Sequence, residues 1–230
     1  MNIQPPEKQL PDQLGQYGIL DVFKVFPTIQ GEGPFAGQRA IFVRLAGCNL
    51  QCPMCDTDYT SQRTKMYALD LLQVVLAHST GPGHLVVITG GEPFRQNLKP
   101  FINELLQCGF KVQIETNGTL YQDLPYHLIT IVCSPKTGSI HQKLAPHVAA
   151  YKYVLDGEPA SDGLPLQALG HSAAPRLARP HEGFFGTTYL QPADEENAEK
   201  NSVNLKNAMQ SVQKHGYTLG LQIHKIIHVE

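Results

Sequence analysis

The stretch GCNLQCPMCDT, residues 47–57, contains three of the chain's five cysteines in the spacing C-x3-C-x2-C. On spacing alone the three thiols could share one face of a helix, but Pro53 lacks a backbone donor and disfavours a helical Cys52. We therefore expect a loop that turns its sulfurs inward. Thiolates are soft ligands that suit an iron–sulfur cluster or zinc, and three of them leave one iron of a four-iron cluster open to a substrate or cofactor.

Two other interpretations of this stretch stay open at this point. One is a structural zinc site with a histidine as fourth ligand, and the other is three unrelated buried thiols. An odd number of cysteines, with three clustered, fits reduced thiols that serve a metal better than a disulfide framework. Cys108 and Cys133 lie in apolar surroundings, and we expect them to be ordinary buried residues.

Length and composition favour one enzyme-sized domain. The chain has 230 residues, of which 42% are apolar, so we expect a single domain over residues 1–230, with 1–18 as an N-terminal arm or tail. The net charge of -2 gives no general electrostatic reason to bind nucleic acid or a membrane surface, so the partner is expected to be small. Neither a membrane span nor a signal peptide is evident, which leads us to expect a cytoplasmic protein.

Strand and helix patterns alternate on both sides of the cysteine stretch. This alternation predicts an α/β fold with a parallel sheet, and too few units are present for the eight of a complete barrel. We expect a partial, incomplete TIM-like barrel with ligands at the carboxyl ends of its strands. The expected strands are 22–26, 40–45, 85–89, 111–115, 128–133, 151–155, 187–191 and 218–223, the expected helices are 68–78, 97–107, 142–149 and 195–215, and 171–186 is expected to be a loop.

Polar and glycine-rich motifs follow several of these strands. Gly90-Gly91-Glu92-Pro93 follows 85–89, and its two glycines would let backbone carbonyls approach a bound ammonium group. Ser134-Pro135-Lys136 follows 128–133 and pairs a hydroxyl with a cation. Each motif is weak alone, since a tight turn or a solvated lysine explains it equally well.

Together the motifs give the chain a specific resemblance. C-x3-C-x2-C is the pattern of radical S-adenosylmethionine (SAM) enzymes, and the chain also carries Q-G-E-G at 30–33, G-G-E-P, S-P-K, Q-P-A-D at 191–194 and L-Q-I-H-K at 221–225. In this combination it resembles the 7-carboxy-7-deazaguanine synthases of queuosine and 7-deazapurine biosynthesis. The resemblance covers most of residues 22–230 and is weakest over 171–186.

The resemblance implies an activity, a fold and a set of partners. It implies the incomplete barrel of the radical SAM type and a lyase that converts 6-carboxy-5,6,7,8-tetrahydropterin to 7-carboxy-7-deazaguanine with loss of ammonia. The implied cofactors are one 4Fe-4S cluster per chain, SAM and Mg2+. An external reductant such as a flavodoxin would supply the electron, and the family forms homodimers. The family's magnesium is completed by substrate and water oxygens, since a single hydroxyl is a poor site for this ion.

The resemblance also assigns residues. Arg39 matches an arginine that meets the substrate carboxylate, Met54 replaces a residue that is often aromatic, Ile223 replaces a threonine, and Glu230 matches by position only. The implied sets are Cys48, Cys52 and Cys55 for the cluster; Thr57 for Mg2+; Met54, Asp56, Gly90, Gly91, Glu92, Ser134, Pro135, Lys136, Gln191, Pro192, Ala193 and Asp194 for SAM; and Ile29, Gln30, Gly31, Glu32, Arg39, Thr89, His224 and Glu230 for substrate.

Two alternative functions remain open. A glycyl-radical activase, or another radical SAM enzyme, would share the cysteines and residues 90–92 but would have no reason to bring Gln30, Glu32, Arg39 and His224 together. A zinc-stabilised binding protein would not be an enzyme at all. Iron, sulfide and zinc analysis separates it from both radical enzymes.

Overall fold

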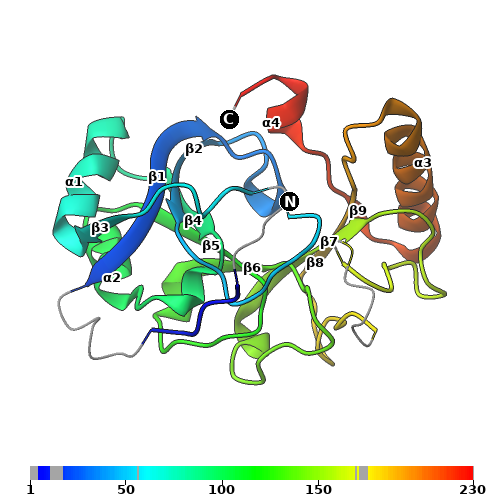
Figure 1. Cartoon of the computed structure of the whole chain (residues 1–230), viewed down its shortest axis with the longest axis horizontal. Coiled ribbons are helices and arrows are strands. Elements are labelled where there is room, and N and C mark those ends of the chain that lie inside the picture. The colour runs from blue at the N-terminus through cyan, green and yellow to red at the C-terminus, as the bar shows by residue number, and fades with distance from the viewer. Residues whose placement is uncertain (1–4, 11–17, 56, 169, 171–175, 230) are drawn as a thin grey trace.

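The computed structural model describes residues 5–10, 18–55, 57–168, 170 and 176–229. Within these residues the strands form one sheet in the order β3-β1-β2-β4-β5-β6-β7-β8-β9 (Figure 1). The strands are β1 (Ile19–Ile29), β2 (Arg39–Leu45), β3 (Thr64–Tyr67), β4 (Leu85–Gly90), β5 (Lys111–Thr116), β6 (Ile129–Cys133), β7 (Val148–Leu155), β8 (Thr187–Pro192) and β9 (Thr218–Leu219). The α-helices are α1 (Ala68–His78), α2 (Lys99–Gln107), α3 (Ala198–His215) and α4 (Ile223–Ile226).

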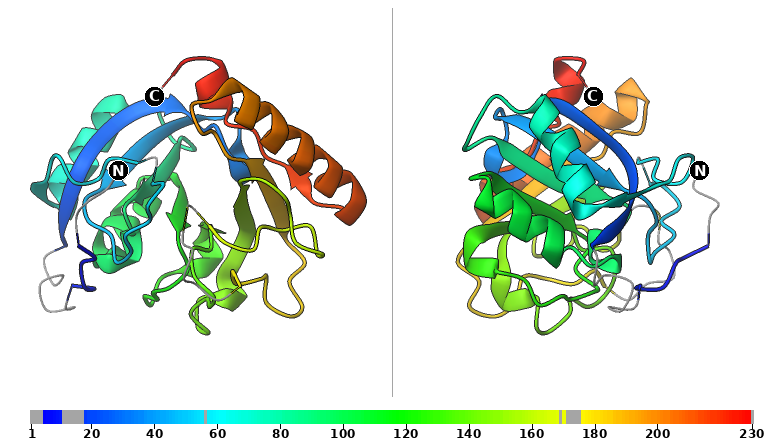
Figure 2. Two further views of the ribbon diagram at one scale, coloured as in Figure 1. Left: turned by 45° about the vertical axis from the view of Figure 1, so that its right-hand side comes forward. Right: turned by 90° about the vertical axis from the view of Figure 1, so that its left-hand side faces the viewer.

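The sheet is an open arc of mostly parallel strands. From β2 through β9 each strand pairs in parallel with its neighbour, whereas β1 runs antiparallel to both β2 and β3. The arc curves with its helices on the outside: α1 and α2 lie toward the β1 side, and α3 lies beside β8 and β9 (Figure 2). The edge strands β3 and β9 do not pair with each other, so the expected incomplete barrel is confirmed.

Alternation along the strands decides what each face carries. On β2, Ile41, Val43 and Leu45 are fully buried in the core beneath the helices, because side chains at every second position share a face. Phe42 and Arg44 point to the inner face. Because the parallel strands end at the same edge, the loops that follow them meet there, and this edge contains the candidate site.

Several sequence expectations require correction. The expected helix over 142–149 is wrong: only a single 3-10 turn, Ala145–His147, forms there, and β7 already begins at Val148. The expected strand over 218–223 is wrong beyond Leu219, where Gly220 ends it and α4 follows. Strand β3, a short edge strand of which no residue is fully buried, has no counterpart among the expected strands. Helix α1 has the predicted bounds.

Candidate active site

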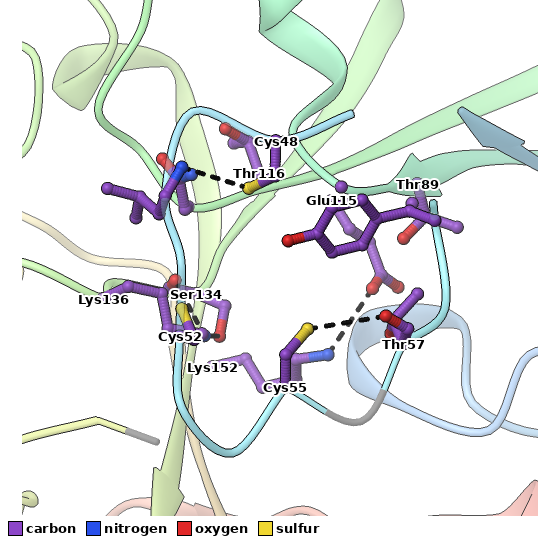
Figure 3. Close-up of a pocket in the computed structure, with 15 residues that line it drawn as sticks. Cys48, Cys52, Cys55, Thr57, Thr89, Glu115, Thr116, Ser134, Lys136 and Lys152 are labelled. Atoms are coloured by element: carbon purple, nitrogen blue, oxygen red, sulfur yellow. Dashed lines mark hydrogen bonds and ion pairs between the residues drawn. The ribbon is translucent and has the colours of Figure 1, made fainter. Parts of the chain in front are cut away.

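The cysteine loop follows β2 and lines a cavity at the carboxyl edge of the sheet. Cys48, Cys52 and Cys55 are all reduced, and all three line this cavity (Figure 3). No helix forms through Pro53, and the Cys55 N–H donates to the Cys52 carbonyl at 3.3 Å in a tight turn. The chain therefore presents three thiols from a loop to one cavity, as the proline and the spacing predicted.

In the part of the chain that the structure describes, the three thiols do not converge with other side chains on one point, as the ligands of a single zinc ion would. A structural zinc needs four ligand atoms about 2.0 to 2.3 Å from one point. Among the described residues, no three His, Cys, Asp or Glu side chains converge in this way. An iron–sulfur cluster instead takes each thiolate on a separate iron, so its ligands stand apart. Burial raises the pKa of Cys48 to about 12, so the thiolate needs the positive charge that iron would supply.

Gly90 and Gly91 allow the end of β4 to lie against the cysteine loop. A Cβ atom added at Gly90, where φ is +124°, would lie 2.2 Å from the Leu45 carbonyl oxygen. A Cβ at Gly91 would lie 2.0 Å from the Gly47 carbonyl oxygen. Both glycines line the cavity, so backbone forms this part of its wall. Their lack of side chains also lets the end of β4 pack closely against the start of the cysteine loop.

Glu92 lies behind this wall and not in the cavity. Its side chain is fully buried, and its carboxylate accepts from the Phe94 N–H at 3.0 Å, the Thr116 hydroxyl at 2.7 Å and the Asn117 N–H at 2.8 Å. Burial raises the pKa of Glu92 above its ordinary value. The expectation that this carboxylate meets a cofactor does not agree with its place: Glu92 joins the end of β4 to the end of β5.

The other expected cofactor residues surround two adjoining cavities. Ser134, Lys136 and Lys152 line both of them, and the Lys136 ammonium donates to the Ser134 hydroxyl at 2.5 Å. The second cavity is also lined by Met54, Gln191, Ala193 and Asp194. Pro135 and Pro192 lie between lining residues in the chain, and Asp56 lies outside the described residues.

A charged network lies between the cavities on the inner face of the sheet. Lys152 on β7 pairs with Glu32 and, at 3.5 Å, with Glu115 on β5. Burial raises the pKa of Glu32, but attraction to the Lys152 ammonium and hydrogen bonds from Lys152 and Gln222 together outweigh burial and lower the pKa to about 2. The Gln30 amide donates to Glu115 at 2.9 Å, and the Gln191 amide donates to Glu32 at 3.1 Å.

The Q-G-E-G loop and the C-terminal segment meet beside this network. The Ile223 N–H donates to the Gly31 carbonyl at 3.1 Å, and the Gln222 amide donates to Glu32 at 2.9 Å. A Cβ at Gly31 would lie 1.9 Å from Nδ1 of His224, so only glycine leaves room for this ring. The structure thus brings Gln30, Gly31, Glu32 and His224 together, next to Ile29 at the end of β1; Glu230 lies outside the described residues.

The structure does not bring Arg39 to the site. Arg39 begins β2, so it lies at the amino edge of the parallel strands, the opposite edge from the cysteine loop. Its side chain is exposed and donates to Thr80. The expectation that Arg39 meets a substrate carboxylate does not agree with this position.

Arg44 is the arginine that sequence reasoning missed. It pairs in parallel register with Thr89, which lines the first cavity, and neighbours in such a register point to the same face. Its guanidinium lies 5.3 Å from the centre of the Phe26 ring, and its Nε is buried with no partner among the described residues. The available signal was a lone cation in the apolar run 40–45, four residues before Cys48. Lys152 was missed in the same way, as a lone cation in β7.

Two further interior amides keep unpaired atoms. Within the described chain, Oε1 of Gln113 and Oε1 of Gln191 are buried without a partner. Buried polar atoms are usually hydrogen-bonded, and Gln191 lines the second cavity, so its unpaired oxygen indicates a polar ligand there that donates to it. With the unpaired Nε of Arg44, the inner face offers acceptors for ring N–H groups and a donor for an anionic group.

Comparisons with known proteins agree with this arrangement. Residues 43–132 match the model of the Radical SAM superfamily. The chain is 43% identical over 216 residues to the 7-carboxy-7-deazaguanine synthase of Rhodospirillum rubrum, covering 90% of this chain and 91% of the relative. It is 37% identical to that of Rickettsia prowazekii, covering 92% of this chain and 89% of the relative. The crystal structure of QueE from Escherichia coli is similar in fold, with a TM-score of 0.67 and 24% identity over 89% of this chain and 94% of that one.

Proposed function

Because the chain belongs to the 7-carboxy-7-deazaguanine synthases, a family of radical SAM enzymes, we propose that it converts 6-carboxy-5,6,7,8-tetrahydropterin to 7-carboxy-7-deazaguanine with loss of ammonia. The observation that carries this proposal is the polar inner face. A loop with three thiols opens onto the same cavity as Thr89, Glu115 and Lys152 (Figure 3). Such a face can orient a polar ring beside a cluster.

The cofactors divide between the two cavities. We assign the cluster to Cys48, Cys52 and Cys55, and SAM to the wall formed by Gly90, Gly91 and the residues lining the second cavity. When bound, the cluster and SAM supply the hydrogen-abstracting radical of this family. The protein's share is to bind, orient and exclude water. The Lys136 ammonium and the Ser134 hydroxyl suit the carboxylate or ribose of SAM. The ammonium is positively charged, and both groups can donate hydrogen bonds.

The substrate is assigned to the inner face of the sheet. Gln191, which lines the second cavity, offers an unpaired carbonyl oxygen to ring N–H groups, and Arg44 offers a guanidinium to the carboxylate. Glu32 and Glu115 share Lys152, so one of their two negative charges is compensated before substrate enters. Thr57 lines the same cavity, and we assign it as a minor ligand of a magnesium ion whose other oxygens come from substrate and water.

We also propose a reductant, an oligomeric state and a cellular location for this protein. An external one-electron reductant such as a flavodoxin supplies the electron, in keeping with the family. A homodimer is supported by exposed apolar side chains on α3 and beside α4, which include Val203, Met209 and Ile227. No helix in the described part of the chain is long and apolar enough to cross a membrane. The five reduced cysteines and the cluster chemistry favour the cytoplasm, where thiols stay reduced.

An anaerobic assay tests the function directly. Protein reconstituted with iron and sulfide is mixed with SAM, dithionite, Mg2+ and the carboxypterin, and we expect 7-carboxy-7-deazaguanine and ammonia. Cys52→Ala should lose the brown absorbance and the product together. Cys108→Ala is the matched control and should keep both, because Cys108 follows α2 and does not line the cavities.

The same assay separates the alternatives. A colourless protein with one zinc and no sulfide would favour the zinc-stabilised binding protein. A brown protein that cleaves SAM but leaves the carboxypterin unchanged would favour an activase. The convergence of Gln30, Glu32 and His224 on one face supports the synthase against the activase.

A further inference from the structure

The N-terminal arm, residues 5–10, lies against the back of the cysteine loop. The Glu7 N–H donates to the carbonyl of Cys48 at 2.8 Å, and the Leu10 N–H donates to the carbonyl of Arg95 at 2.7 Å. The Gln9 amide donates to the Phe94 carbonyl at 3.0 Å. The arm thus bonds directly to the backbone of a cysteine that lines the cavity, although more than thirty residues separate them in sequence.

The Glu7 carboxylate also completes a charge network under this loop. It pairs with Arg63 at 2.5 Å and with Arg95 at 3.1 Å. Arg95 is 1% exposed, and its other bonds run to the Ala46 carbonyl at 3.1 Å and to Asp21 at 3.4 Å. A buried guanidinium is costly without close carboxylates, and Glu7 is the nearer of the two that Arg95 contacts, so it helps to keep Arg95 in this position.

Gly47 connects the network to the first cysteine. Its φ is +83°, and a Cβ there would lie 2.7 Å from the Arg95 Nε and 2.7 Å from the Glu7 Oε1. The backbone immediately before Cys48 therefore packs directly against the Glu7–Arg95 ion pair. On its other side the Gly47 carbonyl accepts from the Glu92 N–H at 3.0 Å, so this peptide is held between the arm and the end of β4.

We propose that Glu7 is a positioning residue of the cluster site: through Arg95 and its own N–H it fixes the Gly47–Cys48 backbone, so that the Cys48 sulfur stays in place as a cluster ligand. Cys48, whose carbonyl accepts from the Glu7 N–H, is the first of the three cysteines in the loop. The arm thus acts on the first ligand. This inference rests on the proposed function, because it takes the three thiols as ligands of a cluster.

Iron release from the holoprotein measures this role. Anaerobically reconstituted wild type, Glu7→Ala and Glu7→Gln are mixed with a ferrous chelator, and coloured complex is followed with time. We expect release on the order of tenfold faster in Glu7→Ala, since a charge-assisted contact to a buried cation is lost. Glu7→Gln keeps the shape and one acceptor and should fall between. Lys8→Ala, at an exposed position in the same arm, is the matched control and should release iron at the wild-type rate.

Thiol labelling distinguishes local positioning from general loosening. During release, iodoacetamide is added and each cysteine is quantified by peptide mass spectrometry. We expect Cys48 to be labelled ahead of Cys55 in Glu7→Ala, while the fully buried Cys133 stays protected in every variant. Equal release rates for Glu7→Ala and wild type would overturn the proposal, as would labelling of Cys133 in step with Cys48. A wild type that binds no cluster would instead overturn the proposed function.

Discussion

At the scale of single residues, the position of one arginine is the sharpest test of the substrate site. Arg44→Lys removes the planar, bidentate donor and keeps the charge, so substrate binding should weaken by about 1.5 to 3 kcal/mol, or about one to two orders of magnitude in KM. Cleavage of SAM without substrate should hardly change. Arg39→Lys is the matched control, because its side chain is exposed at the opposite edge of the sheet. A raised KM in Arg39→Lys, with Arg44→Lys unaffected, would reverse the assignment.

Lys152 holds two buried carboxylates together, so its removal should be costly. Lys152→Met leaves Glu32 and Glu115 without their cation and should lower the free energy of unfolding by about 3 to 5 kcal/mol at neutral pH. Lys206→Met, at an exposed position on α3, should change it by less than about 0.5 kcal/mol. Urea unfolding measures the free energy of unfolding of both variants. An equally small decrease in the two would show that the ion pairs of Lys152 add no stability.

The ion pair between Lys152 and Glu32 should make the stability of the protein depend on pH. Because the pKa of Glu32 is lowered from its ordinary 4.5 to about 2, its contribution to stability is complete above about pH 4.5 and is lost as the pH falls toward 2. The stability difference between wild type and Lys152→Met should therefore shrink over this range. Unfolding curves at neutral and acid pH test this, and a difference that grew on acidification would contradict it.

Thr57 carries the prediction for magnesium. If its hydroxyl is a minor ligand in a site completed by substrate, turnover should rise with Mg2+, while SAM cleavage without substrate should not. Thr57→Ala should move the dependence to higher Mg2+, and Thr57→Ser, which keeps the oxygen, should preserve most of it. Iron content is measured in each variant, because the Cys55 thiol donates to the Thr57 carbonyl at 3.6 Å. Equal wild-type turnover with and without Mg2+ would remove the role.

At the scale of elements, sequence patterns identified what lies in the core and missed what lies at its edges. Helix α1 matched its predicted bounds because its apolar spacing follows from packing on the sheet. The error over 142–149 arose because the apolar residues of a short segment fit either period, and only the pairing of β7 with β6 decides between them. Strand β3 is short and partly exposed, so it carries no clear alternation.

The residues of the candidate site likewise fall into those that the sequence could predict and those that it could not. The cysteine spacing and the two glycines identified the loop and its wall, because both signals are local in sequence. Arg44 and Lys152 could not be identified from the sequence alone. Their role depends on which strand lies beside which and which face is inward, and these are properties of the sheet.

The junction of β4 with the cysteine loop gives a prediction at this scale. Gly91→Ala places a Cβ 2.0 Å from the Gly47 carbonyl oxygen, so backbone must shift and unfolding free energy should fall by about 1 to 3 kcal/mol. Iron content after reconstitution should fall as well, since the displaced backbone leads into Cys48. Gly220→Ala is the control, because its Cβ meets nothing nearer than 3.5 Å. Full iron content in Gly91→Ala would show that the loop does not depend on this contact.

At the scale of the whole molecule, we expect the sheet to be stable through its own apolar packing, whereas the loop at its carboxyl edge should be stabilised by bound cofactors. In β4, Val86, Val87 and Ile88 are fully buried by apolar neighbours and need no metal. In its described residues, 46–55 and 57–63, the cysteine loop has neither helix nor strand, so no regular backbone pairing holds it. A ligand that binds only the folded state stabilises what it touches, so the cluster should order the loop far more than the sheet.

Hydrogen exchange tests this division. We compare the full chain with and without its cluster, under anaerobic conditions, and expect faster amide exchange in residues 46–63 once the cluster is removed. Exchange in β4, β5 and β6 should change little, because their amides are held by parallel pairing and their side chains contribute to the apolar core. Residues 5–10 should follow the loop, since the Glu7 N–H donates to Cys48. If β4 lost protection as strongly as the loop, the cluster would be a requirement for the fold itself, and the sheet could not be regarded as an independent scaffold.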